Sequence, residues 1–448
     1  MSEKIIVVGV NHAGTACTKQ ILTLNPGADV TVIDKNNNIS FLGCGMALWI
    51  GNQITKSDGL FYSDKTQLES LGAKVMMETE VTDVDYDQKK VVYKAADGTV
   101  GELQFDKLVL AVGSSPIMPP IKGMDLKYVQ KAKLFQDAQL AVDEIKNDDS
   151  IKTVTVVGAG YIGAELAEAY RRVGKEVILI DALDRILGTH FDRDFSDIMA
   201  ARLESEGIKL HLGEKVQEFV GTERVEKVIT DKGEYQTDLV MMCIGFRANI
   251  GLGKGKLDLF KERAFLVNKK QETSVPGVYA IGDCATVYDN SIRESNYIAL
   301  ATNAVRSGLV AAFNVCGAPV ESLGVQGSSG LCLYDLKMVS TGQTVETAAA
   351  HGIKALATDF EAQQKPAFMD EAGANPNVKI RIVYREDDHT VIGAQIMSEY
   401  DMSASLHMFS LAIQEKVTIE KIALLDIFFM PHFNEPYNYI TMAAFSAI

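Results

Sequence analysis

The order of apolar and polar positions divides the start of the chain into short, regular elements. It predicts a strand at KIIVVGV, a tight turn at NHAG, a helix at TACTKQILTL and a second strand at ADVTVIDK. The same order returns later as TVTVVGAG, YIGAELAEAYRRVG and KEVILID. Each set is a βαβ unit, so the chain repeats one half of a nucleotide-binding fold. We therefore expect two bound nucleotides.

The remaining segments show other patterns. VTDVDYDQKKVVYKAADGTV alternates like the strands of a hairpin, and LVLAVGSSPIMPPIKG leads from an apolar strand into a Gly/Pro-rich crossing near Pro119 and Pro120. Two further strands are predicted at DLVMMCIGF and GVYAIGDCA. From about Gly324 onward, the strand-like KIRIVY and VIGAQIM accompany two amphipathic helices, one of them SASLHMFSLAIQ, without another phosphate loop. This part is expected to be a third, α+β domain.

The fold class predicted from these patterns is α/β, with two Rossmann-like dinucleotide-binding domains and an α+β C-terminal domain. The first dinucleotide-binding domain is expected to comprise residues 1–118 and 246–324, and the second residues 119–245. Residues 325–448 are expected to form the C-terminal domain.

Composition narrows the class of protein. The chain has 448 residues, 47% of them hydrophobic, which is enough for two or three cores. Its net charge of −15, without a basic stripe, argues against a nucleic-acid partner. No stretch approaches the roughly 20 apolar residues of a membrane span, and no export signal is recognised. The chain has six cysteines, which lack metal-ligand spacing: Cys17, Cys44, Cys243, Cys284, Cys316 and Cys332. We therefore expect a cytoplasmic protein without zinc or structural disulfides.

The second βαβ unit carries a complete dinucleotide motif, Gly158-Ala159-Gly160-Tyr161-Ile162-Gly163, between its strand and its helix. The first glycine makes the turn, the second admits the pyrophosphate, and the third lets helix and strand pack closely. Asp181 ends the next strand, where it would accept hydrogen bonds from a ribose 2′-hydroxyl and repel a 2′-phosphate. NADH is therefore expected in preference to NADPH.

The first loop, Gly9-Val10-Asn11-His12-Ala13-Gly14, departs from the motif because Asn11 replaces the second glycine. Asp34 still closes the following strand, as a ribose-binding acid would; the alternative is an ordinary βα turn. His12 stands at the helix N-terminus, whose dipole disfavours a positive charge, so a neutral imidazole is expected. It either meets the pyrophosphate or only caps the helix.

SFLGCGMALW isolates one cysteine, Cys44, between Gly43 and Gly45. The flanking glycines open access to the sulfur, and the helix beginning near Met46 is expected to lower its pKa and favour the thiolate. The positions five residues away hold Ile39 and Trp49, so no second thiol is available locally. A reactive thiolate without a partner is oxidised to a sulfenic acid. The alternative is a buried, inert cysteine.

Four of these motifs occur together: GVNHAG with Asp34, SFLGCG, GAGYIG with Asp181, and AIGDCA. In combination they resemble the NADH oxidase and NADH peroxidase group of the pyridine-nucleotide flavoprotein reductases, and most closely its water-forming NADH oxidases. The resemblance extends through LVLAVGSSP, NYIALATNAVRSG, VQGSSG and DIFFMPHFNEPYNYI. Many members have serine at the position of Gly43.

The resemblance implies FAD in the first loop, NADH in the second, no metal, and a homodimer formed through the C-terminal domain. It places Cys44 as the peroxidatic sulfur, with His12 beside it. Tyr161 would move aside for NADH, and Trp49 is assigned to packing. The FAD residues implied are Gly9, Asn11, His12, Ala13, Gly14, Asp34, Cys44, Val81, Gly113, Ser114, Asp283, Ala299, Leu300 and Ala301. The NADH residues implied are Gly158, Gly160, Tyr161, Ile162, Gly163, Glu165, Asp181 and Gly245.

Within this set, Asp283 would bind the ribitol or pyrophosphate part of FAD, and the helix starting near Ala299 and Leu300 would point its N-terminus at the flavin. The activity implied is the reduction of O2 to two waters by two NADH, through the flavin and Cys44. Alternatives are an NADH peroxidase, a coenzyme A disulfide reductase, or a flavoprotein that passes electrons to a protein partner.

Overall fold

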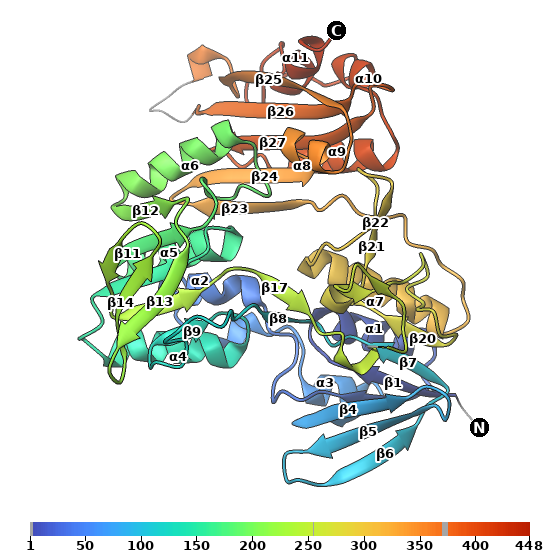
Figure 1. The fold of residues 1–448 in the computed structure, drawn as a ribbon. Coiled ribbons are helices and arrows are strands. Elements are labelled where there is room, and N and C mark those ends of the chain that lie inside the picture. Colours follow the sequence, from blue (N-terminus) through green and yellow to red (C-terminus); the bar gives the residue numbers. More distant parts are fainter. Residues whose placement is uncertain (1–2, 254, 370–374) are drawn as a thin grey trace.

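The strands of the first βαβ unit lie at the centre of a parallel sheet of order β20-β7-β1-β2-β3 (Figure 1). The computed structural model describes residues 3–253, 255–369 and 375–448. The strands are β1 (Lys4–Val8), β2 (Asp29–Ile33), β3 (Lys74–Met76), β7 (Lys107–Leu110) and β20 (Val278–Ala280). The last of these comes from late in the chain, so two separate segments build this sheet.

Two helices cover one face of this sheet and pack against each other: α1 (His12–Leu24) and α7 (Ala301–Val315). Gly308 permits their close approach, because a Cβ at that position would lie 2.4 Å from the backbone oxygen of Ala13. The predicted helix near Ala299 and Leu300 is confirmed as α7, with Leu300 as its N-cap.

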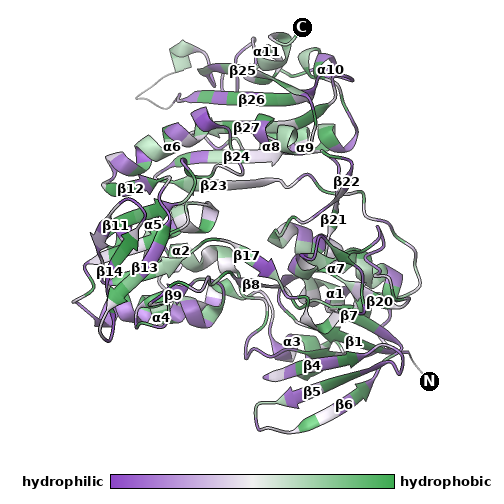
Figure 2. Ribbon diagram, viewed as in Figure 1, coloured by the Kyte–Doolittle hydropathy of each residue, from purple (hydrophilic) through white to green (hydrophobic). Residues whose placement is uncertain are grey.

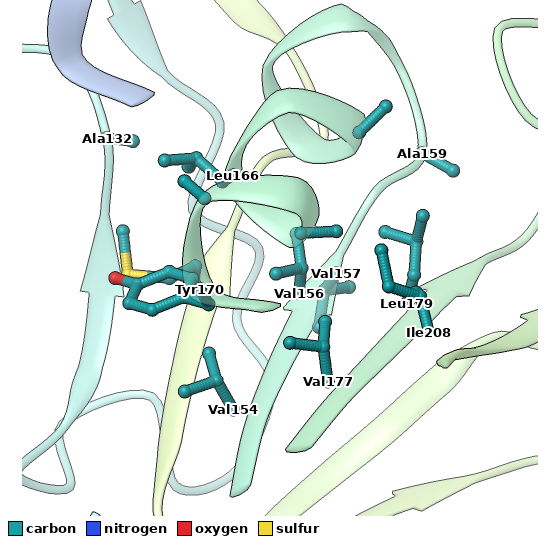
Figure 3. Close-up of a cluster of buried hydrophobic side chains, with 14 of the residues drawn as sticks. Ala132, Val154, Val156, Val157, Ala159, Leu166, Tyr170, Val177, Leu179 and Ile208 are labelled. Atoms are coloured by element: carbon teal, nitrogen blue, oxygen red, sulfur yellow. The ribbon is translucent and has the colours of Figure 1, made fainter. Parts of the chain in front are cut away.

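The second βαβ unit forms a parallel sheet of the same design, in the order β12-β11-β10-β16-β9. Its core contains Tyr170 and Leu166 of the central helix, packed against valines of the adjacent strands (Figure 3). The elements are β9 (Val129–Lys131), α4 (Phe135–Asn147), β10 (Thr153–Val157), α5 (Tyr161–Arg172), β11 (Glu176–Asp181), α6 (Arg193–Ser205), β12 (Ile208–Leu212) and β16 (Leu239–Met242).

The internal repeat is larger than the sequence pattern predicts. In each half an antiparallel three-stranded sheet is inserted before the fourth strand of the parallel sheet. The first is the predicted hairpin region, with β4 (Thr79–Asp85), β5 (Lys90–Ala95) and β6 (Val100–Gln104). The second, which we did not predict, contains β13 (Val216–Gly221), β14 (Val225–Thr230) and β15 (Glu234–Gln236).

The C-terminal part forms an antiparallel sheet of order β23-β24-β27-β26-β25 (Figure 2), and its middle strand, β27, is buried along its whole length. The predicted strands at KIRIVY and VIGAQIM and the helix at SASLHMFSLAIQ are confirmed. The elements are β23 (Ser329–Leu333), β24 (Leu336–Gly342), α8 (Val345–Ala350), β25 (Ala355–Gln363), β26 (Asn377–Arg385), β27 (Val391–Ser398), α9 (Ser403–Gln414), α10 (Ile419–Ala423) and α11 (Tyr439–Phe445).

Short elements connect these parts. An antiparallel pair, β8 (Ser114–Pro116) with β17 (Phe246–Ala248), lies where the chain crosses between the two parallel sheets (Figure 1). The other short elements are α2 (Met46–Ile50), α3 (Lys65–Ser70), β18 (Leu259–Phe260), β19 (Ala264–Phe265), β21 (Val287–Asp289) and β22 (Glu294–Asn296). Among the described residues, the helices are all too short or too polar to traverse a lipid bilayer.

The second parallel sheet and the C-terminal sheet are joined by buried polar contacts. The backbone N–H of Asp192 donates to the side-chain oxygen of Gln395 at 2.8 Å, and the Gln395 amide donates back to the Asp192 carboxylate at 2.6 Å. Glu168 of α5, also buried, accepts a hydrogen bond from the backbone N–H of Tyr334 at 2.8 Å. Because buried polar groups are costly to leave unpaired, these contacts fix how the two parts dock.

Candidate active site

The two glycine loops have matching geometry. Gly9 and Gly158 have φ of +94° and +103°, and a Cβ at either position would lie 2.3 or 2.4 Å from a backbone oxygen of the neighbouring strand end. A Cβ at Gly14 or Gly163 would lie 1.9 or 1.7 Å from the oxygen of the first glycine of the same loop. A side chain at any of these four positions would therefore require the chain's own backbone to shift.

The middle position of each loop is different. A Cβ at Gly160 would have no heavy atom within 4 Å, so this glycine leaves open space before the N-terminus of α5. In the first loop the exposed Asn11 takes the same place, as the N-cap of α1. Neither helix receives a side-chain hydrogen bond at its N-cap. Free N–H groups facing open space fit the pyrophosphate of a dinucleotide.

The two predicted ribose-binding acids also match each other. Asp34 accepts hydrogen bonds from the backbone N–H groups of Val10 and Asn36, both at 2.7 Å. Asp181 accepts from Ala159 at 2.5 Å and from Leu183 at 2.7 Å. Each carboxylate thus holds its glycine loop in place and keeps lone pairs free for a ribose hydroxyl. Burial raises the pKa of Asp34.

Cys44 lies in the 3₁₀ turn Gly43–Gly45, directly before α2, and its side chain is exposed at the surface. The expectation that the pKa of Cys44 is lowered is wrong. Desolvation by the surrounding protein is the largest effect and raises this pKa, and the negative charge of Glu165 raises it further. The helix that follows has only five residues, Met46–Ile50, so its dipole is weak. Desolvation and the charge of Glu165 therefore outweigh the stabilisation of the thiolate by the helix dipole.

His12 is the first residue of α1 and is expected to be neutral. Burial lowers its pKa, which supports that expectation, although burial and not the helix dipole is the main cause. The charge of Asp283 raises the pKa of His12 and the charge of Lys133 lowers it. The same two charges act on Cys44. His12 and Cys44 therefore belong to one cluster with Lys133 and Asp283.

This cluster is built around the Asp283 carboxylate, which follows β20 in the first sheet. Ser114 donates to it from 2.7 Å, and the Lys133 ammonium lies 3.2 Å from the same oxygen. Lys133 also donates to Ser114 at 3.0 Å and lies 4.4 Å from the ring centre of Phe246. Lys133 follows β9 of the second sheet, so this ion pair joins the two parallel sheets beside Cys44.

The second loop has its own group of aromatic and acidic side chains. The Tyr161 hydroxyl is 2.9 Å from the hydroxyl of Ser329, and its ring centre is 4.4 Å from that of His190. Burial lowers the pKa of His190 to about 4, which leaves its imidazole neutral. Burial and the charge of Glu168 raise the pKa of Glu165 to about 7. A carboxyl group whose pKa is raised to near neutrality is typical of functional sites.

The remaining predicted residues lie near these loops in the chain. Gly113 precedes β8 with φ of +66°, and Gly245 precedes β17 with φ of +101°. Val81 lies in β4 and belongs to the apolar cluster that contains Val8 and Ile33. The others lie at helix N-termini: Ala13 in α1, Ile162 in α5, and Ala299, Leu300 and Ala301 at or just before the start of α7. Trp49 is buried and stacks on Phe135, with ring centres 5.6 Å apart, which confirms its assignment to packing.

Sequence reasoning missed three residues of this region: Lys133, His190 and Tyr62. Tyr62 lies with its hydroxyl 2.9 Å from Nδ1 of His12. Each of the three contacts a site residue distant in sequence, and none belongs to a motif. Only Lys133 had a signal in the sequence: in KAKLF it lies between a strand and a helix, where a side chain can reach a neighbouring domain.

Residues 3–308 match the family model of the pyridine nucleotide-disulphide oxidoreductases, and residues 328–439 match the dimerisation domain of the same family. The chain belongs to this family. Its α/β fold class is confirmed, and membership also confirms the two cofactors expected from the sequence, FAD and NADH.

Similar proteins extend over the full chain. An NADH oxidase of Streptococcus pyogenes is 56% identical over 99% of this chain and 99% of its own length. The solved structure of the water-forming NADH oxidase from Lactobacillus brevis, bound to NADH, is 41% identical, with a TM-score of 0.96 over 100% of this chain and 98% of that one. An engineered water-forming NADPH oxidase made from it is 40% identical to this chain. Its TM-score is 0.96, and the match covers 99% of this chain and 98% of that one.

The contrast between Gly160 and Gly163 can be tested by substitution. Gly163→Ala should lower the thermal midpoint, because its Cβ would overlap a backbone oxygen unless the loop shifts. Gly160→Ala should leave the thermal midpoint nearly unchanged but weaken NADH binding at least tenfold (roughly 1.4 kcal/mol), because its methyl group enters the open space before α5. Calorimetry and NADH titration measure the two effects. Equal NADH affinity in Gly160→Ala and the parent would contradict this assignment.

The charge of Lys133 should affect the reactivity of Cys44. Removing it in Lys133→Met should raise the pKa of Cys44 further, because the positive charge stabilises the thiolate. Alkylation of Cys44 in the NADH-reduced holoenzyme, followed by mass spectrometry across pH, should then require a higher pH. The exposed Lys131→Met, two residues away, is the matched control. An unchanged pH profile in Lys133→Met would show that the ammonium does not act on the sulfur.

Proposed function

We propose that this chain is an FAD-dependent NADH oxidase that reduces O2 to water, with Cys44 cycling between thiolate and sulfenic acid. One observation carries the proposal: the isolated Cys44 shares its charged neighbours with His12, in a chain that matches a water-forming NADH oxidase from end to end. All six cysteines are free, so Cys44 is not in a disulfide.

In this proposal the first loop holds FAD and the second holds NADH. The FAD-binding domain then comprises residues 1–118 and 246–324, the NADH-binding domain residues 119–245, and the dimerisation domain residues 325–448. When bound, FAD supplies a hydride acceptor for NADH and a two-electron donor for O2. Asn11, His12 and Ala13 would face the FAD pyrophosphate, and Asp34 its ribose. Asp283 would contact the ribitol region, and the N-terminus of α7 would favour negative charge on the flavin. The free cysteines fit a reducing cytoplasm.

Cys44 removes the hydrogen peroxide formed from the first NADH. Its thiolate attacks one oxygen, so that an S–O bond forms as the O–O bond breaks and the departing hydroxide takes a proton to become water. The second NADH supplies the two electrons that, with protons, return the sulfenic acid to the thiol and release the second water. In total, two NADH, two H⁺ and one O2 give two NAD⁺ and two waters.

The neighbours of Cys44 assist in two ways. Lys133 stabilises the thiolate, against the opposing charges of Glu165 and Asp283. His12 is neutral and donates a hydrogen bond to the departing oxygen, as a neutral imidazole does in other enzymes. Since the pKa of Cys44 is raised, the thiolate is the minor form near neutrality, and the peroxide step should accelerate as the pH rises toward that pKa.

Asp181 supports a preference for NADH, because its carboxylate sits at the end of β11 beside the second loop. The engineered NADPH oxidase carries five substitutions, one of which replaces an aspartate by alanine. Loss of a negative charge fits acceptance of a 2′-phosphate. We therefore propose NADH as the substrate of this chain.

An NADH peroxidase would use the same cysteine and differ in one property, the reaction of reduced flavin with O2. An oxygen electrode with NADH separates the two. Rapid O2 uptake with one O2 consumed for two NADH supports the oxidase, whereas NADH oxidation that requires added hydrogen peroxide would establish the peroxidase.

Replacement of Cys44 tests the sulfenic acid cycle. Cys44→Ser should still bind FAD, oxidise NADH and consume O2, but should release about one hydrogen peroxide per NADH, because a serine hydroxyl does not ionise near neutrality. The parent should release almost none. Peroxide is measured with and without catalase. If Cys44→Ser forms only water, the sulfur has no part in the reaction.

The C-terminal part is proposed to form a homodimer. The segment between α10 and α11 exposes a continuous set of large apolar side chains, which single soluble chains rarely do: Leu424, Leu425, Phe428, Phe429, Met430, Phe433 and Tyr437. The match to the family's dimerisation domain covers this segment.

Light scattering should therefore give twice the chain mass at micromolar concentration. Phe428→Asp combined with Phe433→Asp should give the monomer, because two charges would be buried unpaired in the interface. Leu323→Asp, also highly exposed but outside this segment, is the control and should remain dimeric. A monomeric parent, or a dimeric double variant, would refute this surface as the interface.

A further inference from the structure

Tyr62 is paired with His12 in a way that the proposed reaction does not yet explain. Its hydroxyl lies 2.9 Å from Nδ1 of His12, and the two rings are stacked, with centres 5.7 Å apart and planes inclined by 4°. Both a hydrogen bond and a ring contact thus act on one imidazole. Together they restrict rotation of the His12 ring.

Tyr62 is itself held by the segment that carries Cys44. The hydroxyl of Ser40, four residues before Cys44, accepts hydrogen bonds from the backbone N–H groups of Tyr62 at 3.0 Å and Ser63 at 2.7 Å, and donates to the Ser63 oxygen at 2.9 Å. Ser40 is fully buried and has a left-handed φ of +62°. Nearby, the backbone N–H of Leu42 donates to the oxygen of Leu60 at 2.8 Å.

These contacts connect the two proposed reacting residues, although they are far apart in sequence. Ser40 fixes Tyr62, and Tyr62 fixes His12. The polypeptide that presents the sulfur therefore also sets the orientation of the imidazole. A displacement of this segment would move both groups together.

The protonation states decide the direction of the hydrogen bond. Burial raises the pKa of Tyr62 to about 12, so its hydroxyl keeps its proton, and burial lowers the pKa of His12, so its ring is neutral. Tyr62 and a neutral imidazole could in principle each be the donor. A phenol is a stronger acid than a neutral imidazole N–H, so the favoured bond runs from the Tyr62 O–H to Nδ1. The ring proton then resides on Nε2.

We propose that Tyr62 is a positioning residue that holds the His12 ring with its Nε2–H free to donate to the oxygen leaving Cys44. This inference rests on the proposed function, because it assumes that His12 acts in peroxide reduction. The charges around the pair are Asp283 and Lys133, which act on His12, and Lys19, whose ammonium lies 6.0 Å from the Tyr62 ring centre. Lys133 opposes protonation of the ring and Asp283 favours it.

Tyr62→Phe preserves the ring contact and removes only the hydroxyl. The reduced holoenzyme, mixed with hydrogen peroxide in a stopped-flow instrument, should form its oxidised state about five- to tenfold more slowly than the parent. The KM for NADH should not change, and more peroxide should escape per NADH during turnover. Tyr86→Phe is the matched control. Tyr86 lies in the turn between β4 and β5, and its hydroxyl donates to the backbone oxygen of Leu252 at 3.1 Å.

Nitrogen NMR of the ¹⁵N-histidine-labelled holoenzyme tests the contact independently of turnover. In the parent, His12 should show an unprotonated, hydrogen-bonded Nδ1 and a protonated Nε2 at pH 7, and Tyr62→Phe should shift the Nδ1 resonance and mix the two tautomers. His12→Ala identifies the signal. A parent with the proton on Nδ1 would overturn the inference, as would a Tyr62→Phe variant that reduces peroxide at the parent rate.

The two proposals fail in different ways. If Cys44→Ser makes only water, the sulfenic acid cycle fails whatever Tyr62 does. If Cys44→Ser releases peroxide but Tyr62→Phe behaves like the parent, the cycle stands and the positioning role fails. If Tyr62→Phe slows the peroxide step without any change at the His12 nitrogens, the hydroxyl does not act through His12, and the inference is rejected.

Discussion

The ion pair between Lys133 and Asp283 is the contact on which the geometry of the candidate site depends. One partner follows the edge strand of the second parallel sheet and the other follows the edge strand of the first, so the pair spans the boundary between them. Both side chains are largely shielded from solvent, which weakens screening and makes either charge costly to leave alone. His12 and Cys44 both lie within the field of this pair, so their chemistry is tied to how the two sheets meet.

The sequence alone predicts the framework because the framework is locally encoded. A Cβ at Gly14 or Gly163 would meet the first glycine of its own strand-turn-helix unit, and the acids that follow bond to the same loops. Apolar alternation was sufficient for β4 and β5. The second inserted sheet, β13–β15, was missed, although β13 and β14 are as long as β5.

The surroundings of the reactive groups could not be predicted in the same way. Nothing near Cys44 in sequence indicates Glu165, yet this carboxylate and the desolvation of the sulfur reverse the effect expected from the following helix. Ser40 and Tyr62 illustrate the same limit, because their bond depends on the pairing of two irregular segments more than twenty residues apart. Local patterns describe turns and helices, whereas the pKa of a side chain depends on every group that folding brings near it.

Trp49, the single tryptophan of the chain, lies on α2 five residues after Cys44, stacked on Phe135 at the start of α4. The indole is buried, and the helix that carries it begins in the turn that holds the sulfur. All tryptophan emission of the molecule therefore originates at one place, against the helix that follows Lys133. Fluorescence of the unmodified protein gives a local optical record of this region, without any introduced dye or competing indole.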